Sequence, residues 1–312
     1  MIIRNSNQDD IPNIVSLLKL SLGEGIIKKS LESWYFKHID NPFGESYVSL
    51  AYKNDILIGV RAFMKWPWQI GDQIWNSYRA VDTATHPDYQ GKGVFKKLTL
   101  KALDDVKSME GDTFVFNTPN QYSRPGYLKM GWKVVDKIEL AVIPTILYAI
   151  PFFFKIKPNN TISFVQLDLL CELHNQKMSN KNVIFTPKSA AYLKWRYEEN
   201  PLQDYIVSSN DNFYIAFYIK KHKFFNELRV VETISSNQNN HLKQIRRVIL
   251  SFAFENNCWV ITTANKSLFW FRLYGKFGPK LTIRTLTQDS LFINTVFTIK
   301  KWRYSIGDLE LF

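Results

Sequence analysis

The sequence has few of the residues that build disulfide or metal frameworks, with only two cysteines, Cys171 and Cys258, in 312 residues. Two isolated cysteines match neither a disulfide scaffold nor a metal-ligand spacing, so we expect no metal. The N-terminus lacks a basic segment followed by an apolar core, so we expect no signal peptide. Together these absences predict a reducing compartment and a cytoplasmic location.

A long apolar run that could span a membrane is also missing. The uncharged stretch at residues 140–154 is shorter than the ~20 residues that a spanning helix needs, and Pro144 and Pro151 interrupt it. We therefore expect no integral membrane segment and interpret the stretch as a strand end followed by a buried or interdomain linker. Attachment to a membrane surface is the alternative, although the pattern is not clearly amphipathic.

Net positive charge is small in the first half of the chain and large in the second. Residues 1–150 hold 18 Lys and Arg against 16 Asp and Glu, and residues 151–312 hold 22 against 12, giving net charges of +2 and +10. A basic half suggests an acidic partner such as nucleic acid, an anionic membrane or a phosphorylated substrate. No helix-turn-helix, zinc-finger or aromatic RNA-binding signature accompanies it, so we expect no nucleic acid.

The stretch Val81–Lys97 organises the chain. Its start is rich in β-branched residues and predicts a strand, which Pro87 ends because proline cannot donate to a sheet ladder. Beyond Gly93 the apolar residues recur at helical spacing. The sequence therefore predicts a strand, a turn containing Gly91 and Gly93, and a helix whose first N–H groups form an anion site suited to a pyrophosphate.

The spacing of the glycines excludes two other phosphate-binding loops. A Walker A loop needs four residues between its glycines and then Lys and Ser or Thr, and a dinucleotide fingerprint needs a third glycine where Lys96 stands. The stretch instead resembles the acyl-CoA motif Gln/Arg-x-x-Gly-x-Gly/Ala of the GNAT superfamily of N-acyltransferases, with Gln90, Gly93 and Phe95 at its three defined positions. At the third position Phe95 replaces the usual small residue. We expect this replacement to affect the local packing more than the anion site.

A second motif supports the resemblance. Residues 127–132 read Tyr-x-x-x-Gly-aromatic, which resembles the GNAT motif whose tyrosine lies beside the thioester sulfur. The resemblance implies acetyl-CoA or another acyl-CoA as co-substrate, Tyr127 as the general acid that protonates the leaving thiolate, and a strand N–H that polarises the thioester carbonyl. The residues that we expect to contact acyl-CoA are Thr83, Ala84, Thr85, Gln90, Gly91, Lys92, Gly93, Val94, Phe95 and Asn120.

The general base is less well defined. Asp82 lies on the organising strand beside the expected thioester contacts, so its carboxylate is our candidate for relaying a proton through water. It could equally be a structural acid paired with Arg79 or Arg61, since acids in ion pairs often look functional. His38 and His86 are the alternative bases.

The second half repeats features of the first in the same order. Residues 195–201 echo residues 36–42, and residues 231–233 echo residues 81–83, but no glycine pair follows the second strand. This order suggests duplication, with two unrelated α/β stretches as the alternative. We predict an α/β (α+β) fold of tandem GNAT-like domains, each a mixed, mostly antiparallel twisted sheet flanked by helices. Residues 1–150 would form the catalytic acyl-CoA domain, and residues 151–312 a degenerate, basic domain on the acceptor side.

Three functions fit these patterns. The first is an N-acyltransferase that moves an acetyl or short acyl group to a small, anionic primary amine, such as an amino sugar or a nucleotide-linked amine. The second is a carrier-linked aminoacyl transferase of the cell-wall type, which the loop at Gln90–Gly93 argues against because that family usually lacks a good CoA loop. The third is a non-catalytic binder of acyl-CoA or of an anionic polymer, which Tyr127 argues against.

Overall fold

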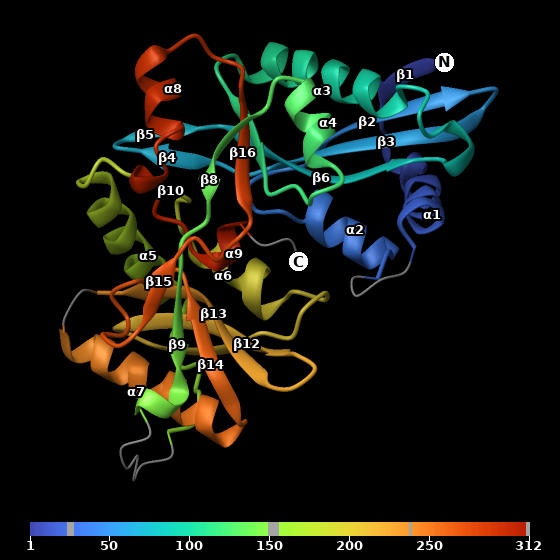
Figure 1. Cartoon of the computed structure of the whole chain (residues 1–312). Coiled ribbons are helices and arrows are strands. Elements are labelled where there is room, and N and C mark those ends of the chain that lie inside the picture. Colours follow the sequence, from blue (N-terminus) through green and yellow to red (C-terminus); the bar gives the residue numbers. More distant parts are fainter. Residues whose placement is uncertain (24–27, 149–155, 237–238, 310–312) are drawn as a thin grey trace. The chain divides into compact units, whose positions relative to one another are not determined.

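Figure 1 shows the computed structural model, which describes residues 1–23, 28–148, 156–236 and 239–309. The chain divides into two compact units. The first unit comprises Met1–Asp136 and Pro279–Lys301, and the second unit comprises Lys137–Gly278 and Trp302–Leu311. The chain thus leaves the first unit after Asp136 and returns to it at Pro279. The predicted boundary at residue 150 falls within 149–155, outside the described residues.

A seven-stranded sheet forms the centre of the first unit. Its strands in spatial order are β1 (Ile2–Asn5), β2 (Tyr47–Lys53), β3 (Ile56–Lys65), β6 (Ser77–Thr85), β7 (Phe114–Asn117), β16 (Lys280–Thr285) and β8 (Lys133–Lys137). β6 and β7 run parallel, while β1–β2, β2–β3, β3–β6 and β7–β16 are antiparallel pairs. The sheet is therefore mixed and mostly antiparallel, as predicted. A hairpin of β4 (Trp68–Ile70) and β5 (Gln73–Trp75) precedes β6.

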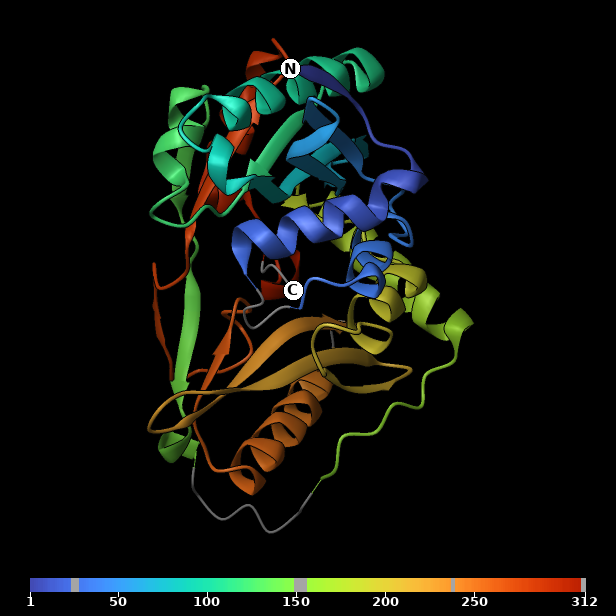
Figure 2. The same ribbon diagram turned by 90° about the vertical axis from the view of Figure 1, so that its right-hand side faces the viewer.

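Helices cover both faces of this sheet (Figure 1 and Figure 2). α1 (Ile11–Leu22) and α2 (Leu31–His38) lie on one face, and α3 (Val94–Glu110) and α4 (Arg124–Lys129) lie on the other. α3 turns one apolar stripe inward, because Val94, Leu98, Ala102 and Val106 recur at helical spacing and are all buried. The remaining elements of this unit are η1 (Gln8–Asp10), η2 (Pro87–Tyr89), α8 (Ser290–Val296) and η5 (Ile299–Lys301).

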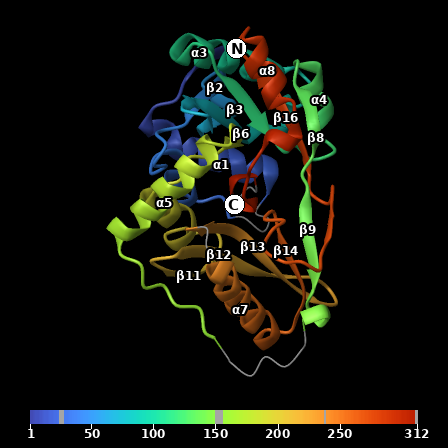
Figure 3. The ribbon, with the colours of Figure 1, turned by 90° about the vertical axis from the view of Figure 1, so that its left-hand side faces the viewer.

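The second unit contains a six-stranded sheet. Its strands in spatial order are β11 (Ile206–Asn210), β12 (Phe213–Lys221), β13 (Asn226–Ser235), β14 (Cys258–Thr263), β9 (Leu140–Pro144) and β15 (Leu273–Gly275). α7 (Asn239–Glu255) covers one face of this sheet (Figure 3), because alternate residues of β12 such as Phe213 and Ile215 share one core with Ile245 and Ile249. Its other elements are η3 (Thr145–Tyr148), α5 (Phe164–Ser179), β10 (Ile184–Phe185), α6 (Ala190–Leu193), the π-helical turn η4 (Lys194–Glu198) and α9 (Ile306–Leu309).

The two sheets share an order of connections. In each unit two antiparallel pairings lead to a long strand, β6 or β13, which is followed by a 17-residue helix and then by a strand parallel to the long one. Each sheet also takes in a strand from elsewhere in the sequence, β16 beside β7 and β9 beside β14. This order agrees with the predicted echo of residues 81–83 by residues 231–233; an origin by duplication stays a prediction.

The uncharged stretch at residues 140–154 begins as β9 and η3, so its first part is a strand of the second sheet. Residues 149–154 lie outside the described residues. In the portion of the chain that the structure describes, no helix combines the length and the apolar character needed to cross a membrane.

Candidate active site

The turn before α3 is open where a ligand phosphate would bind. Gly91 and Gly93 have φ of +73° and +76°, in the left-handed region that favours glycine, and a Cβ at either position meets no atom within 4 Å. The first helical bond runs from Lys97 N–H to Gly93 O. The N–H groups of residues 94–96 thus have no intrahelical acceptor and form an anion site at the positive end of the helix dipole. Val94 contributes only its N–H, since its side chain is buried in the core.

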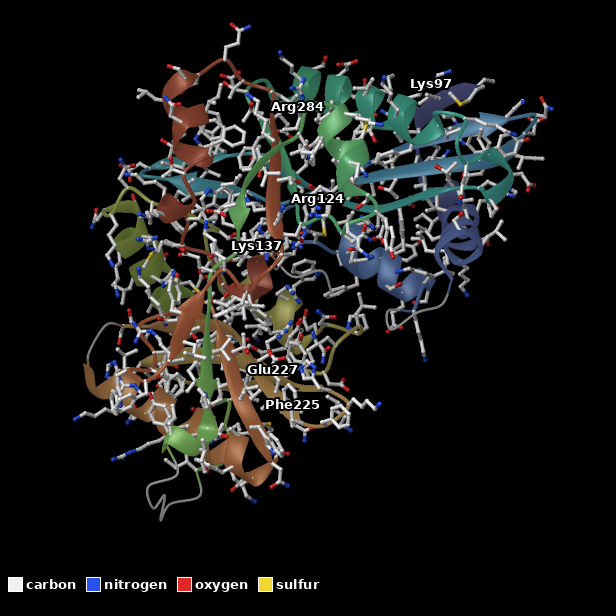
Figure 4. The ribbon with its side chains drawn as sticks, in the orientation of Figure 1. Lys97, Arg124, Lys137, Phe225, Glu227 and Arg284 are labelled. Carbon is white, nitrogen blue, oxygen red and sulfur yellow. The ribbon has the colours of Figure 1, made fainter. Side chains whose placement is uncertain are left out.

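Lysines surround this turn. Lys96 and Lys97 are exposed on the first turn of α3, and Figure 4 labels Lys97 there. Lys92 folds back over the turn, with its Nζ donating to the Asp88 carbonyl at 2.7 Å. His86, one of the alternative bases, accepts the Asp88 N–H at its Nδ1 (3.3 Å) and caps η2. The turn is therefore positively charged, and His86 already has a structural use in it.

β6 and β7 diverge beside this turn. They pair only over Ser77–Arg79, whereas β6 pairs with β3 as far as Thr85. In the described chain, β6 beyond residue 79 thus has no partner strand on its β7 side, and this gap is where the resemblance places the pantetheine arm. Among the predicted contacts along it, Ala84 is buried and Thr83 and Thr85 are partly exposed.

Two of the predicted contact residues are partly used by the fold. Gln90 Nε2 donates to the Thr85 carbonyl at 3.3 Å. Asn120 Oδ1 accepts the N–H groups of Tyr122 (3.0 Å) and Ser123 (2.9 Å) and so shapes the turn that leads into α4. A contact from either side chain to acyl-CoA must therefore come from its other amide atom.

Tyr127 lies on α4 and is 5% exposed. Arg124 begins the same helix (Figure 4). The Tyr127 hydroxyl accepts a hydrogen bond from Arg61 Nη1 at 2.8 Å, and Arg61 Nη1 also donates to Thr83 Oγ1. The predicted acid is therefore connected, through an arginine of β3, to a predicted acyl-CoA contact of β6.

Arg61 is a site residue that the sequence predicts only as a partner of Asp82. It is fully buried at the centre of β3, whose neighbouring residues are apolar. A charged residue inside such a strand is rarely buried without a specific role. That mismatch of charge and surroundings is the signal in the sequence that could have identified it.

The packing around Phe95 explains how this chain accommodates a large residue at the third position of the motif. The Phe95 ring meets the Tyr127 ring edge to face, with centroids 5.6 Å apart. A Cβ on Gly126 would lie 3.2 Å from Phe95 Cε1. Because residue 126 has no side chain, Phe95 fits against α4 and packs beside Tyr127, and its ring lies against Tyr127 rather than over the open glycines.

Asp82 occupies a β-bulge in the middle of β6. Arg61 pairs with Thr83 and Ala62 pairs with Val81, so Asp82 is the extra residue of the ladder. Its φ is +37°, which is uncommon for a residue with a side chain and often marks a functional position. The bulge gives Asp82 surroundings that differ from those of Thr83.

The carboxylate of Asp82 is held by α2. Lys37 Nζ forms an ion pair with it, and His38 Nε2 lies 2.9 Å from Oδ2. The sequence does not predict these partners: Arg61, one of the two expected, binds Tyr127 instead. Asp82 is therefore part of a buried charged cluster on the α2 side of β6.

The charges of this cluster keep Asp82 ionised and His38 neutral. Burial raises the pKa of the Asp82 carboxyl, but Lys37 and His38 outweigh this effect and hold the pKa well below its usual range. Burial lowers the pKa of His38 more than Asp82 raises it, so His38 is neutral at pH 7 and can accept a proton. Its Nδ1 lies 2.8 Å from Ser46 Oγ. A carboxylate that stays ionised is a weak base.

The comparisons with known proteins agree with this geometry. The profile of the acetyltransferase (GNAT) domain matches residues 2–135. Residues 2–135 form a GNAT acetyltransferase domain. No curated protein matches the sequence of the chain. The GNAT domain contains the glycine turn, the β6–β7 gap, Tyr127 and Asp82, so every residue predicted for the site lies within it.

Solved structures resemble the chain beyond the GNAT domain, at identities that show the fold alone. A GCN5-related N-acetyltransferase from Anabaena variabilis is 13% identical with a TM-score of 0.67, over 92% of this chain and 73% of that one. A probable N-acyltransferase from Enterococcus faecalis is 9% identical with a TM-score of 0.65, over 91% and 72%. The Saccharomyces cerevisiae N-myristoyltransferase with bound myristoyl-CoA is 11% identical with a TM-score of 0.54, over 90% and 82%.

Proposed function

We propose that the protein transfers an acetyl or short acyl group from acyl-CoA to a primary amine at the GNAT domain. The observation that carries the proposal is the coincidence, in one unit, of an open turn with left-handed Gly91 and Gly93, a strand freed from its neighbour beyond residue 79, and a buried Tyr127. The turn would bind the pyrophosphate, the free edge of β6 the pantetheine arm, and Tyr127 the sulfur.

In the proposed reaction, the acceptor nitrogen attacks the thioester carbonyl and the C–S bond breaks. A main-chain N–H on the free side of β6 would polarise the carbonyl oxygen. The Tyr127 O–H would then protonate the departing thiolate, which yields CoA as the free thiol. Positioned acids of this kind contribute on the order of 10²–10⁴-fold to rate.

On the base side, we assign the proton acceptor to His38 and its orientation to Asp82. Asp82 holds the Nε2–H of His38, which leaves Nδ1 to accept a proton, as the carboxylate does in other acid–histidine pairs. The Nδ1 contact with Ser46 Oγ at 2.8 Å supports that hydroxyl as the route by which the proton would arrive. Asp82 thus acts through His38 instead of taking the proton through water itself.

The acceptor class rests on charge. The net charge of +10 in residues 151–312 makes anionic amines the first group to test, such as amino sugars and nucleotide-linked amines. In this superfamily variable loops recognise the acceptor, so the fold alone does not identify which amine is used.

A transfer assay tests the proposal. The protein is incubated with acetyl-CoA and a panel of amines, and the free CoA thiol and the acylated product are both measured. We expect thiol release that depends on the amine, with product of the matching mass. Binding of acetyl-CoA without transfer to any amine would instead support the non-catalytic alternative.

A further inference from the structure

We propose that Arg61 is the positioning residue that makes Tyr127 a proton donor; this inference rests on the acyl transfer proposed above. The first step of the argument is the cost of burying Arg61. Its side chain is fully buried, and its Nε and Nη2 have no hydrogen-bond partner among the described residues. Burying a cation without a counter-charge is strongly unfavourable.

Aromatic rings replace the missing counter-charge only in part. The guanidinium carbon lies 4.8 Å from the Phe63 ring centroid, 5.2 Å from that of Tyr127 and 5.6 Å from that of Phe95. Cation–π contacts stabilise a buried arginine, but each contributes much less than a charged partner. An apolar residue of similar volume would be at least as stable here, so stability alone does not account for Arg61.

The hydrogen bond between Arg61 and Tyr127 has only one possible direction. A guanidinium has donors and no acceptor, so the Tyr127 oxygen must accept from Nη1 at 2.8 Å. The phenol hydrogen is then excluded from this contact. Among the described residues no acceptor takes it, so the hydrogen is available to a ligand beside Tyr127.

The charge of Arg61 also fits the product of the proton transfer. When the thiolate takes the proton, the Tyr127 O–H bond breaks, an S–H bond forms and a phenolate remains. That anion would lie within hydrogen-bond distance of Arg61 Nη1, where a hydrogen bond to a charged group is strongest. The proton lost by the acceptor nitrogen to His38 passes to solvent, and solvent returns one to Tyr127, so no proton is gained or lost overall.

A double-mutant cycle in the transfer reaction tests this role. Arg61→Met should lower kcat about 10–100-fold, which is less than the ~10²–10⁴-fold contribution of the acid itself because the phenol remains, and should leave the KM for acyl-CoA within about threefold. In a Tyr127→Phe background the same change should have no further effect on kcat, because there is no phenol left to position. Arg61→Lys should restore part of the rate, since an ammonium can also donate to the phenol oxygen.

Arg79→Met is the matched control, because Arg79 is a buried arginine of the same sheet. Its effect on kcat, whatever its size, should be the same in both backgrounds. Unchanged kcat in Arg61→Met, or an equal loss in both backgrounds, would overturn the proposal and leave Arg61 a structural residue.

A readout without turnover separates this inference from the proposed function. With ¹³Cζ-labelled tyrosine, the Tyr127 resonance can be followed in the folded protein. Its chemical shift should change in Arg61→Met, because the hydrogen bond from Nη1 to the phenol oxygen is gone, and should stay near the wild-type value in Arg79→Met. If the wild type transfers no acyl group but the resonance moves in Arg61→Met alone, the acyltransferase proposal fails and the Arg61–Tyr127 coupling stands. A resonance that does not move in Arg61→Met, or that moves equally in both variants, contradicts the coupling itself.

Discussion

The two units place a buried acid on corresponding strands and surround it differently. In the first unit, Asp82 of β6 is bound by Lys37 and His38, and it sits on a bulge with positive φ. In the second unit, Glu232 of β13 is bound by Lys188 at 2.7 Å. Each acid is almost completely enclosed and each has a lysine partner. Burial and charge pairing therefore do not distinguish a chemical site from a structural one.

The difference lies in what is left unsatisfied nearby. Lys188 also binds Asp308 at 2.7 Å, and the Tyr192 and Tyr197 hydroxyls complete the cluster by donating to Asp308 and Glu232. The described part of the first unit instead contains a β6 edge that has no partner strand on its β7 side beyond residue 79, an open glycine turn, and an arginine, Arg61, whose Nε and Nη2 have no hydrogen-bond partner. We therefore take polar groups that lack hydrogen-bond partners as the mark of the candidate site. A cluster whose charges are paired with one another, like that of Lys188, is taken as structural.

The largest effect that we expect comes from breaking the saturated cluster. Lys188→Met would leave the carboxylates of Glu232 and Asp308 buried without their cation, which typically costs about 3–5 kcal/mol in the free energy of unfolding. Chemical denaturation measures this loss. The folded fraction should still bind acetyl-CoA as the wild type does; a variant of normal stability that no longer binds it would reverse the roles of the two units.

The next effect falls on catalysis. Tyr127→Phe should lower kcat by about 100-fold or more, because it removes the acid, and should leave acetyl-CoA affinity unchanged. Steady-state kinetics and calorimetry check the two halves of this prediction. Tyr78→Phe is the matched control, since Tyr78 is a buried tyrosine of the same unit whose hydroxyl binds Glu110 at 2.7 Å. If both variants remain fully active, Tyr127 is not the acid.

The pH dependence of stability gives a smaller effect, and its sign follows from the lowered pKa values of His38 and Asp82. His38 is neutral in the fold but binds a proton in the unfolded chain below about pH 6.5, so stability falls as the pH drops through that value. The Asp82 contribution is present above the unfolded carboxyl pKa of 3.8 and is lost at lower pH. The slope from one histidine is at most about 1.4 kcal/mol per pH unit.

Urea unfolding between pH 7.5 and pH 3 measures this dependence. His38→Asn should flatten the part of the curve just below pH 6.5, and Asp82→Asn should flatten the part below pH 4. Curves that stay parallel to the wild type would show that neither group changes its protonation on folding.

The smallest effect concerns the lysines of the open turn. Lys96→Gln combined with Lys97→Gln should weaken acetyl-CoA binding about 2–5-fold at low salt, and less at high salt, because exposed charges are screened. Lys107→Gln, at the last turn of α3, is the control and should not change the affinity. An affinity independent of both lysines at every salt concentration would place the phosphates elsewhere.

Much of this site was predictable from the sequence because its signals are local. The strand, the glycine turn and α3 follow from β-branched residues, Pro87 and helical spacing within one short stretch, and Tyr127 follows from its own motif. In the second half the order of elements agrees with the predicted echo of the first, while the tandem GNAT-like character of that half stays a prediction.

The remaining features depend on contacts between distant segments. Lys37 and His38 reach Asp82 from α2, and Arg61 reaches Tyr127 from β3, which no local pattern encodes. The entry of β16 into the first sheet and of β9 into the second could not be seen either, because strand pairing at long sequence separation leaves no periodic signal. The bulge at Asp82 is a matter of register, which the sequence specifies only through the whole sheet.

Calorimetric titration of acetyl-CoA tests the central claim, that the chemistry belongs to the first unit alone. Gly93→Asp puts a side chain and a negative charge at the N-terminal end of α3, and Gly111→Asp makes the same change at a glycine of similar φ, equally open, beyond its C-terminal end. We predict one site per chain, at least 100-fold weaker in Gly93→Asp and unchanged in Gly111→Asp. Binding that survives Gly93→Asp, or a second site per chain, would contradict the account.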